Sequence, residues 1–284
     1  MDTATDTPPP GGAPRPLTET PPNPAPTPQA AAEQELRALT PELAQLRWSS
    51  PFRWLRLGWQ DFRREPGIGL FFGACFVLMG WLLLVVFRHA PAYTLALSAG
   101  FLLMGPFLCL GLYEVSRQLQ FGRSPRIEDA LGAWTSHRGQ LAIFGGALLV
   151  LELIWGRASL VVFAVSFEGV PDFSGSPLAL FSEENLGFLV AYSLVGSVFA
   201  SLIFASCVIS IPMMLDREVD AITAALTSIK LTLTQTGVML LWGGIVALLV
   251  ALAMLPFFLG LLLIGPLLGH ASWHAYQEAV GSAE

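Results

Sequence analysis

Five stretches of the chain are long, apolar and almost free of charge, and they limit what it can fold into more than any other feature. They cover residues 68–87, 93–112, 141–167, 188–211 and 238–276. A helix needs about 20 apolar residues to cross a hydrocarbon core of about 30 Å, so each of the first four stretches suits one span. The last is long enough for two spans, divided at Pro256. The sequence therefore predicts an all-α transmembrane bundle of about six spans. Five spans followed by a re-entrant or amphipathic tail is the alternative, because proline is also tolerated within spans.

The composition agrees with a membrane location. Hydrophobic residues make up 54% of the chain and charged residues only 13%, whereas a soluble domain carries about 25% charge. The net charge is −6 and Lys230 is the only lysine, so nucleic acid is excluded as a partner. We expect membrane lipid to be the main partner, and the sequence does not identify a protein partner.

Basic residues are distributed unevenly between the two sides of the predicted spans. One side carries the residues before the first span and those that follow the second and fourth spans, whereas the other side has Arg88 and an acidic loop over 168–187. The positive-inside rule therefore places the N-terminus in the cytoplasm. The cytoplasmic set comprises Arg37, Arg47, Arg53, Arg56, Arg63, Arg64, Arg117, Arg123, Arg126, Arg138, Arg217 and Lys230.

Three regions follow from this pattern. Residues 1–32 are rich in proline and predict a disordered cytoplasmic tail, and residues 66–280 form the transmembrane domain. Residues 33–65 predict amphipathic cytoplasmic helices, the first over 33–47. Aromatic and arginine side chains alternate in the second, which suits a helix lying among lipid headgroups. The residues predicted to contact lipid are Arg53, Trp54, Arg56, Trp59, Arg63 and Arg64.

A similar order recurs further along the chain. Residues 124–136 and 222–233 have apolar side chains at helical spacing, and each segment precedes a pair of apolar stretches. The sequence thus predicts three helical hairpins, each preceded by an amphipathic helix at the membrane interface.

Two charged residues lie inside the third apolar stretch. A charge in hydrocarbon is costly unless it is paired or faces water, so Glu152 and Arg157 are functional candidates. A separation of five residues places them about 140° apart around a helix, so we do not expect them to pair with each other. A small transporter or channel that uses both residues is one alternative function.

Two histidines near the C-terminus are four residues apart, so they project from the same helix face. His270 and His274 could ligate a metal or haem, although two ligands are half a site and the simpler interpretation is a pair of hydrogen-bonded interfacial side chains. In the six-span arrangement they lie at the cytoplasmic surface near other charged residues. The predicted polar cluster comprises Glu114, Arg117, Asp216, Arg217, His270 and His274. The structural alternative is that each ion pair locks an amphipathic helix to its span.

Catalytic motifs are missing: the sequence has no phosphate-binding glycine loop, no HExxH, no GxSxG and no CxxC. We therefore expect a non-enzymatic scaffold or accessory protein, with no resident metal or cofactor. A haem- or metal-binding respiratory accessory protein is the second alternative.

Four short strings are shared with a known family. They are GWQDF at 58–62, YEVSR at 113–117, IPMMLDR at 211–217 and GHASWHAY at 269–276. Together, and in this order over roughly residues 50–280, they resemble the uncharacterised integral membrane family called domain of unknown function 2189. The resemblance implies a protein of the bacterial inner membrane whose role is not established. Some relatives are labelled as cytochrome oxidase components, but the four histidines of this chain are too few for a haem–copper ligand set.

Overall fold

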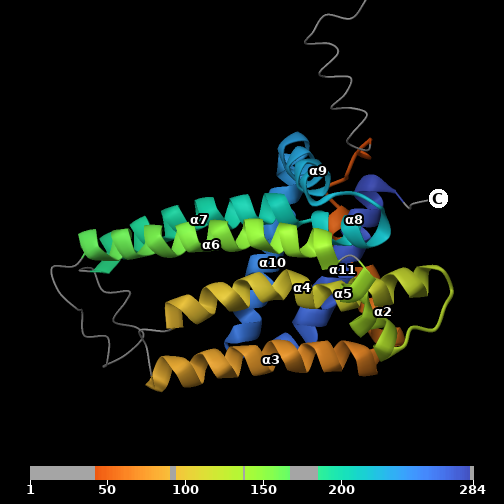
Figure 1. Cartoon of the computed structure of the whole chain (residues 1–284), viewed down its shortest axis with the longest axis horizontal. Helices are drawn as coiled ribbons and strands as arrows, with labels where there is room; N and C mark the ends of the chain where they lie inside the picture. Colours follow the sequence, from red (N-terminus) through yellow and green to blue (C-terminus); the bar gives the residue numbers. More distant parts are fainter. Residues whose placement is uncertain (1–41, 90–93, 137, 167–184, 282–284) are drawn as a thin grey trace, which may run out of the picture. The chain divides into compact units, whose positions relative to one another are not determined.

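A computed structural model describes residues 42–89, 94–136, 138–166 and 185–281, and every regular element within these ranges is helical. The predicted disordered tail over 1–32 and the acidic loop over 168–184 lie outside the described residues. The longest helices coincide with the predicted apolar stretches. They are α3 (Pro66–His89), α4 (Thr94–Gln120), α6 (Arg138–Ser166), α7 (Leu186–Cys207), α10 (Thr236–Met254) and α11 (Leu261–Val280). Figure 1 shows α3, α4, α6 and α7 running side by side.

Four helical segments of the described part are long and apolar enough to cross a membrane: Pro66–Val86, Arg138–Ser166, Leu186–Asp216 and Thr236–Met254. Helix α11 is long enough, but from its midpoint onward it carries His270, His274 and Glu278. The side chains of the first part of α4 are not described. The structure therefore supports an all-helical protein with four candidate spans and does not confirm six.

The predicted break at Pro256 is confirmed. Helix α10 ends at Met254, and the chain then turns back so that α11 begins at Leu261. Phe257 and Phe258 have φ values of 50° and 65°, a left-handed conformation that bulky residues rarely adopt. The indole N–H of Trp81 in α3 donates to the carbonyl of Phe257 over 2.8 Å, which fixes the turn against α3.

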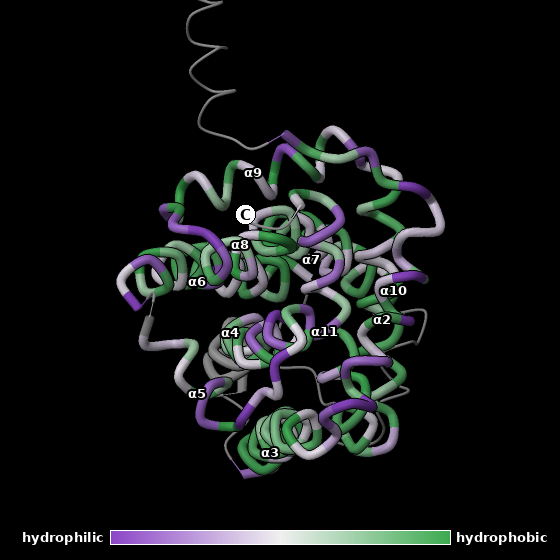
Figure 2. The backbone as a smooth tube through the Cα atoms, turned by 90° about the vertical axis from the view of Figure 1, so that its right-hand side faces the viewer, coloured by the Kyte–Doolittle hydropathy of each residue, from purple (hydrophilic) through white to green (hydrophobic). Residues whose placement is uncertain are grey.

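Helix α11 is the centre of the bundle. It packs mainly against α2 (Ser50–Arg64) and α3, then against α4, and less against α10, which precedes it in the chain. Glycines permit this close approach: a Cβ at Gly73 of α3 would overlap the carbonyl of Leu262, and one at Gly58 would lie 2.7 Å from the backbone nitrogen of Ala271. Figure 2 shows α11 between α2, α3 and α4.

Residues 42–47 form no helix or strand, so the predicted helix over 33–47 is wrong for this part; residues 33–41 lie outside the described residues. The backbone bonds to other segments instead of to itself. Ala44 N–H donates to the carbonyl of Ala279 over 2.9 Å. The side chain of Gln235, at the start of α10, accepts from Leu46 N–H over 2.6 Å and donates to the Ala44 carbonyl over 2.7 Å. These partners satisfy the groups that a helix would have paired internally.

Helix α2 is amphipathic, but its inner face is covered by protein. Trp54, which we expected to contact lipid, is fully buried; its ring packs edge-on against Trp242 of α10. The hydrophobic pattern identified an apolar face without identifying what covers it. The remaining predicted lipid contacts are exposed, and Phe52, which was not among them, is exposed beside them. We call this set the α2 outer face: Phe52, Arg53, Arg56, Trp59, Arg63 and Arg64.

The remaining short helices are α5 (Ile127–Ser136), α8 (Ser210–Asp216) and α9 (Ala221–Thr234). Helix α9 buries small and polar side chains such as Ala224 and Thr227 against the protein. Ile222, Leu226 and Leu233 are instead 69%, 45% and 72% exposed. Leu231 is buried, but a helix that presents several large apolar side chains outward suits the boundary between lipid and water.

Candidate functional site

The four strings that carry the family resemblance meet around the second half of α11. One string contributes Asp61 from α2, the next Ser116 from α4, the third Asp216 from α8, and the last His270 and His274 from α11 itself. We call this region, made of α2, α5, α8 and residues 270–280 of α11, the polar end of the bundle. The neighbouring ends of α4 and α6 lead into it (Figure 1).

A buried network joins three helices at the polar end. Ser116 Oγ donates to Asp61 Oδ2 over 2.8 Å and lies 2.8 Å from His270 Nδ1. His274 Nε2 lies 2.8 Å from the same Asp61 oxygen. Asp61, Ser116 and His270 are 6%, 1% and 0% exposed. We call these four residues the buried network.

The bonding pattern fixes the protons of the buried network. A hydroxyl has one proton and an ionised carboxylate only accepts. The Ser116 hydroxyl therefore donates a hydrogen bond to Asp61 and accepts one from the Nδ1–H of His270. His274 donates a hydrogen bond from its Nε2–H to Asp61. The second nitrogen of His270, Nε2, then carries a lone pair; it is buried and has no hydrogen-bond partner in the described part of the chain.

This order differs from that of a hydrolase. In a catalytic triad the histidine lies between serine and aspartate and removes the serine proton. Here Ser116 lies between Asp61 and His270, so the hydroxyl donates its hydrogen bond to the carboxylate and not to the histidine. Ser116 is 1% exposed. The arrangement joins α2, α4 and α11 through side-chain hydrogen bonds.

The two histidines contact different partners within the buried network. Each uses one ring nitrogen for the buried network, His270 through Ser116 and His274 through Asp61. Among the described residues, no group of three or more histidine, cysteine or acidic side chains has the spacing of a metal site.

A second set of contacts ties α8 to the end of α11. The Tyr276 hydroxyl donates to Asp216 Oδ2 over 2.7 Å and accepts from Arg217 Nε over 3.0 Å. The Arg217 guanidinium also donates to the carbonyls of Val280 and Gly281 over 3.2 and 3.0 Å. The last carbonyls of a helix have no partner within the helix, and a cation beside them stabilises the helix. Arg217 thus caps α11.

Glu114 and Arg117 form a pair within α4. The guanidinium donates to both Glu114 oxygens, over 2.8 and 3.0 Å. The hydrogen bonds with Glu114 raise the pKa of Arg117 further above its ordinary value, and the nearby charge of Asp216 adds to this effect. The members of the predicted polar cluster therefore make their hydrogen bonds in three local sets: Glu114 with Arg117, Asp216 and Arg217 with Tyr276, and His270 and His274 with Ser116 and Asp61.

Glu278 anchors α2 to α11. Its carboxylate accepts from Ser50 Oγ over 2.6 Å, from Trp54 Nε1 over 2.5 Å and from Arg53 over 2.5 Å. Burial alone would raise the pKa of this carboxyl, but the three donors outweigh it and the pKa is lowered from its ordinary value of 4.5.

Replacing Glu278 by glutamine is expected to remove part of the acid sensitivity of the protein. Because the folded-state pKa lies below the unfolded value, the ionised carboxylate stabilises the fold above about pH 4.5 and loses this effect as the pH falls through the folded value. Unfolding measured in detergent at pH 7 and at stepwise lower pH should give a shallower pH dependence for Glu278→Gln. A variant with the slope of the wild type would contradict this role.

Glu152 and Arg157 are not paired with each other in the structure. Glu152 of α6 is 3% exposed, and its Oε2 has no hydrogen-bond partner in the described part. Arg157 is exposed on the outer side of the same helix. The structure therefore places one residue against neighbouring helices and the other on the outer surface.

Sequence reasoning did not select several residues that make the closest polar contacts. Asp61, Ser116 and Tyr276 lie within the four strings, so the strings themselves were the available signal. Glu278 lies outside them, and its partners Ser50 and Trp54 are 228 and 224 positions away. No spacing rule connects residues at that separation.

The comparisons with known proteins agree with the family resemblance over part of the chain. Residues 94–216 match a family described as "Predicted integral membrane protein (DUF2189)". This range runs from α4 to α8 and contains Ser116 and Asp216, whereas Asp61 and both histidines of the buried network lie outside it. No curated protein and no solved structure shows significant similarity to this chain.

Proposed function

We propose that this integral membrane protein is a non-enzymatic scaffold or accessory protein of the bacterial inner membrane that binds anionic lipid through the α2 outer face. The observation that carries the proposal is the division of α2 into two faces. One face is fastened to α11 by Glu278 and the buried network, whereas the other presents arginine and aromatic side chains outward.

The α2 outer face has the chemistry of a headgroup-binding surface. Phe52 and Trp59 are 60% and 43% exposed, and aromatic rings of this kind favour the membrane boundary. Arg53 is engaged by Glu278, but Arg56, Arg63 and Arg64 have no ion-pair partner among the described residues. Guanidinium groups bind phosphate well, and basic residues close to a membrane attract anionic lipid.

The proposal includes the topology predicted from the sequence. In this topology α4 and α11 are the fifth and sixth spans, in addition to the four candidate spans, and the N-terminus lies in the cytoplasm. Arg117 and Arg217 lie next to the polar end, to which the α2 outer face belongs, and this accords with the positive-inside rule. Hydrophilic segments of α2, α5 and α9 are visible from this end in Figure 2.

The alternatives have less support. A transporter that uses both intramembrane charges would bring them into one path, whereas Arg157 faces outward and Glu152 inward. A haem or metal site would need further ligands, and each histidine already gives one nitrogen to the buried network.

Removing two arginines from the α2 outer face is expected to weaken binding of anionic lipid by tenfold or more, since each basic residue near a membrane contributes about 1 kcal/mol. The variant is Arg56→Gln with Arg63→Gln, and the measurement is a titration of the purified full chain in detergent with short-chain phosphatidylglycerol or phosphatidylcholine. The matched control replaces two exposed arginines outside α2, Arg123→Gln with Arg126→Gln. Wild-type affinity in the α2 variant, or an equal loss in the control, would refute the lipid-binding surface.

A further inference from the structure

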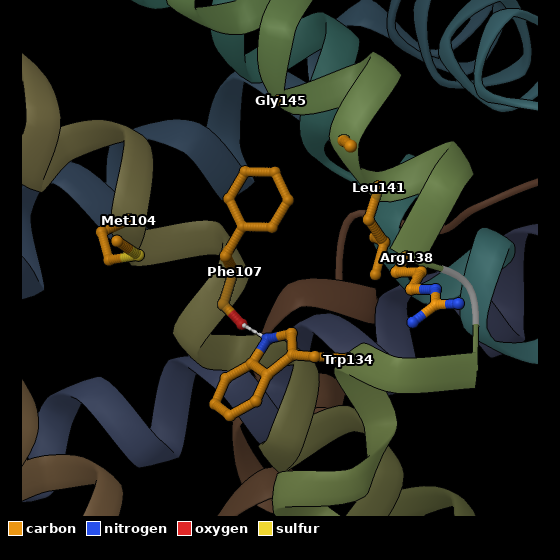
Figure 3. A pocket seen from close by; sticks show the side chains of 7 residues that line it. Met104, Phe107, Trp134, Arg138, Leu141 and Gly145 are labelled. Carbon is orange, nitrogen blue, oxygen red and sulfur yellow. Dashed lines mark hydrogen bonds between the residues drawn. The ribbon is translucent and has the colours of Figure 1, made fainter.

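A groove of about 340 Å³ lies between α4, α5 and α6, separate from the α2 outer face. This volume is within the range of small-molecule sites, about 300–1,000 Å³. Figure 3 shows Met104 and Phe107 on one wall, Leu141 and Gly145 on the other, and Trp134 below them. The lining residues are Met104, Phe107, Trp134, Arg138, Leu141, Ala142 and Gly145.

The groove is apolar except at one edge. The only polar group of the Trp134 ring, its indole N–H, is bound by the carbonyl of Phe107 over 3.0 Å, so the ring is fixed as an apolar wall. Arg138 is exposed at the edge opposite Met104 (Figure 3). No acidic partner of Arg138 occurs among the described side chains.

The position of Arg138 also bears on what the groove holds. It is the first residue of the candidate span Arg138–Ser166, so it marks the level at which the apolar helix meets the polar end. A cation in the first turn opposes the helix dipole, so α6 itself gains nothing from this charge. A negatively charged group outside the protein would balance it.

We propose that this groove binds one anionic membrane phospholipid, with its phosphate at Arg138 and the upper part of an acyl chain along Phe107, Leu141 and Ala142. The occupant follows from the combined chemistry: an apolar groove beside a candidate membrane span, with one cation at its edge that has no ion-pair partner among the described residues. A soluble anion would use the cation and not the channel. The site is independent of the α2 outer face, so either proposal can fail alone.

Two substitutions test the two parts of the groove. Ala142→Phe fills the apolar channel from an exposed position, and Arg138→Gln removes the charge. Their matched controls lie on the same helix outside the groove: the exposed Ala147→Phe and the exposed Arg157→Gln. The full-chain protein is purified in detergent and titrated with phosphatidylglycerol or phosphatidylcholine, and native mass spectrometry counts the lipids that remain bound.

The wild type is expected to retain one phosphatidylglycerol in preference to phosphatidylcholine. Ala142→Phe should lower the affinity for both lipids, and Arg138→Gln should lower that for phosphatidylglycerol by about tenfold, the effect of losing one hydrogen-bonded charge. The controls and the Arg56→Gln with Arg63→Gln variant should keep the tightly bound lipid. Wild-type occupancy in either groove variant would overturn the proposal, as would an equal loss in its control.

Discussion

Replacing Asp61 by alanine is expected to lower the free energy of unfolding by about 3 kcal/mol. The carboxylate is the shared acceptor for Ser116 and His274. Asp61 and Ser116 are buried, and His274 is partly buried. Without Asp61 both donors lose their partner, and Ser116 can no longer orient His270. The three helices that meet there, α2, α4 and α11, would be loosened together. Equilibrium unfolding in mixed detergent micelles, followed by circular dichroism, measures the loss.

Two controls separate the role of the buried network from the mere loss of a charge. Glu218 is exposed and has no hydrogen-bond partner among the described residues, so Glu218→Ala should change the stability by less than about 0.5 kcal/mol. Asp61→Asn keeps the shape and one acceptor oxygen, so its loss should be intermediate. If Asp61→Ala were as stable as Glu218→Ala, the buried network would have no structural role.

Replacing Gly73 by alanine is expected to destabilise the protein by about 2 kcal/mol, although alanine is the better helix former. The added methyl group would overlap the carbonyl of Leu262, a backbone atom that cannot rotate away as a side chain does. Helices α3 and α11 would have to move apart along a shared interface. The same unfolding measurement detects this, and the melting temperature should fall in parallel.

The matched control is Gly146→Ala in α6, where an added Cβ meets nothing within 4 Å. There the change should be neutral or should stabilise the helix by up to about 1 kcal/mol. Opposite signs for one substitution at two helical glycines would show that contact with α11, and not helix propensity, determines the effect at Gly73. Equal effects would contradict this explanation.

The helices could be predicted from the sequence because lipid imposes a length. Each apolar stretch of about 20 residues became a helix, and the break at Pro256 was predictable because no single span uses 39 residues. Gly69 and Gly73 have the spacing of small residues that permits close helix packing, but this spacing does not identify α11 as the neighbour of α3.

The sequence does not predict whether protein or lipid covers the apolar face of each amphipathic helix. Helix α2 and helix α9 have the same kind of pattern, yet α2 turns Trp54 into the protein and α9 turns Ile222 outward. A hydrophobic periodicity shows that a face avoids water, and both lipid and protein satisfy that requirement. The buried network was equally hidden, because Asp61 and His274 are 213 positions apart and only the tertiary fold brings them together.

The anchoring of α2 by α11 has a consequence for how the protein is made. Ser50 leaves the ribosome 228 residues before its partner Glu278, so during translation α2 emerges without the helix that completes it. Until α11 is synthesised, Trp54 lacks its acceptor Glu278 and Asp61 lacks its contact with His274. Contacts this distant in the chain also form slowly. A product that stops before α11 would therefore leave the inner face of α2 without the side chains that anchor it.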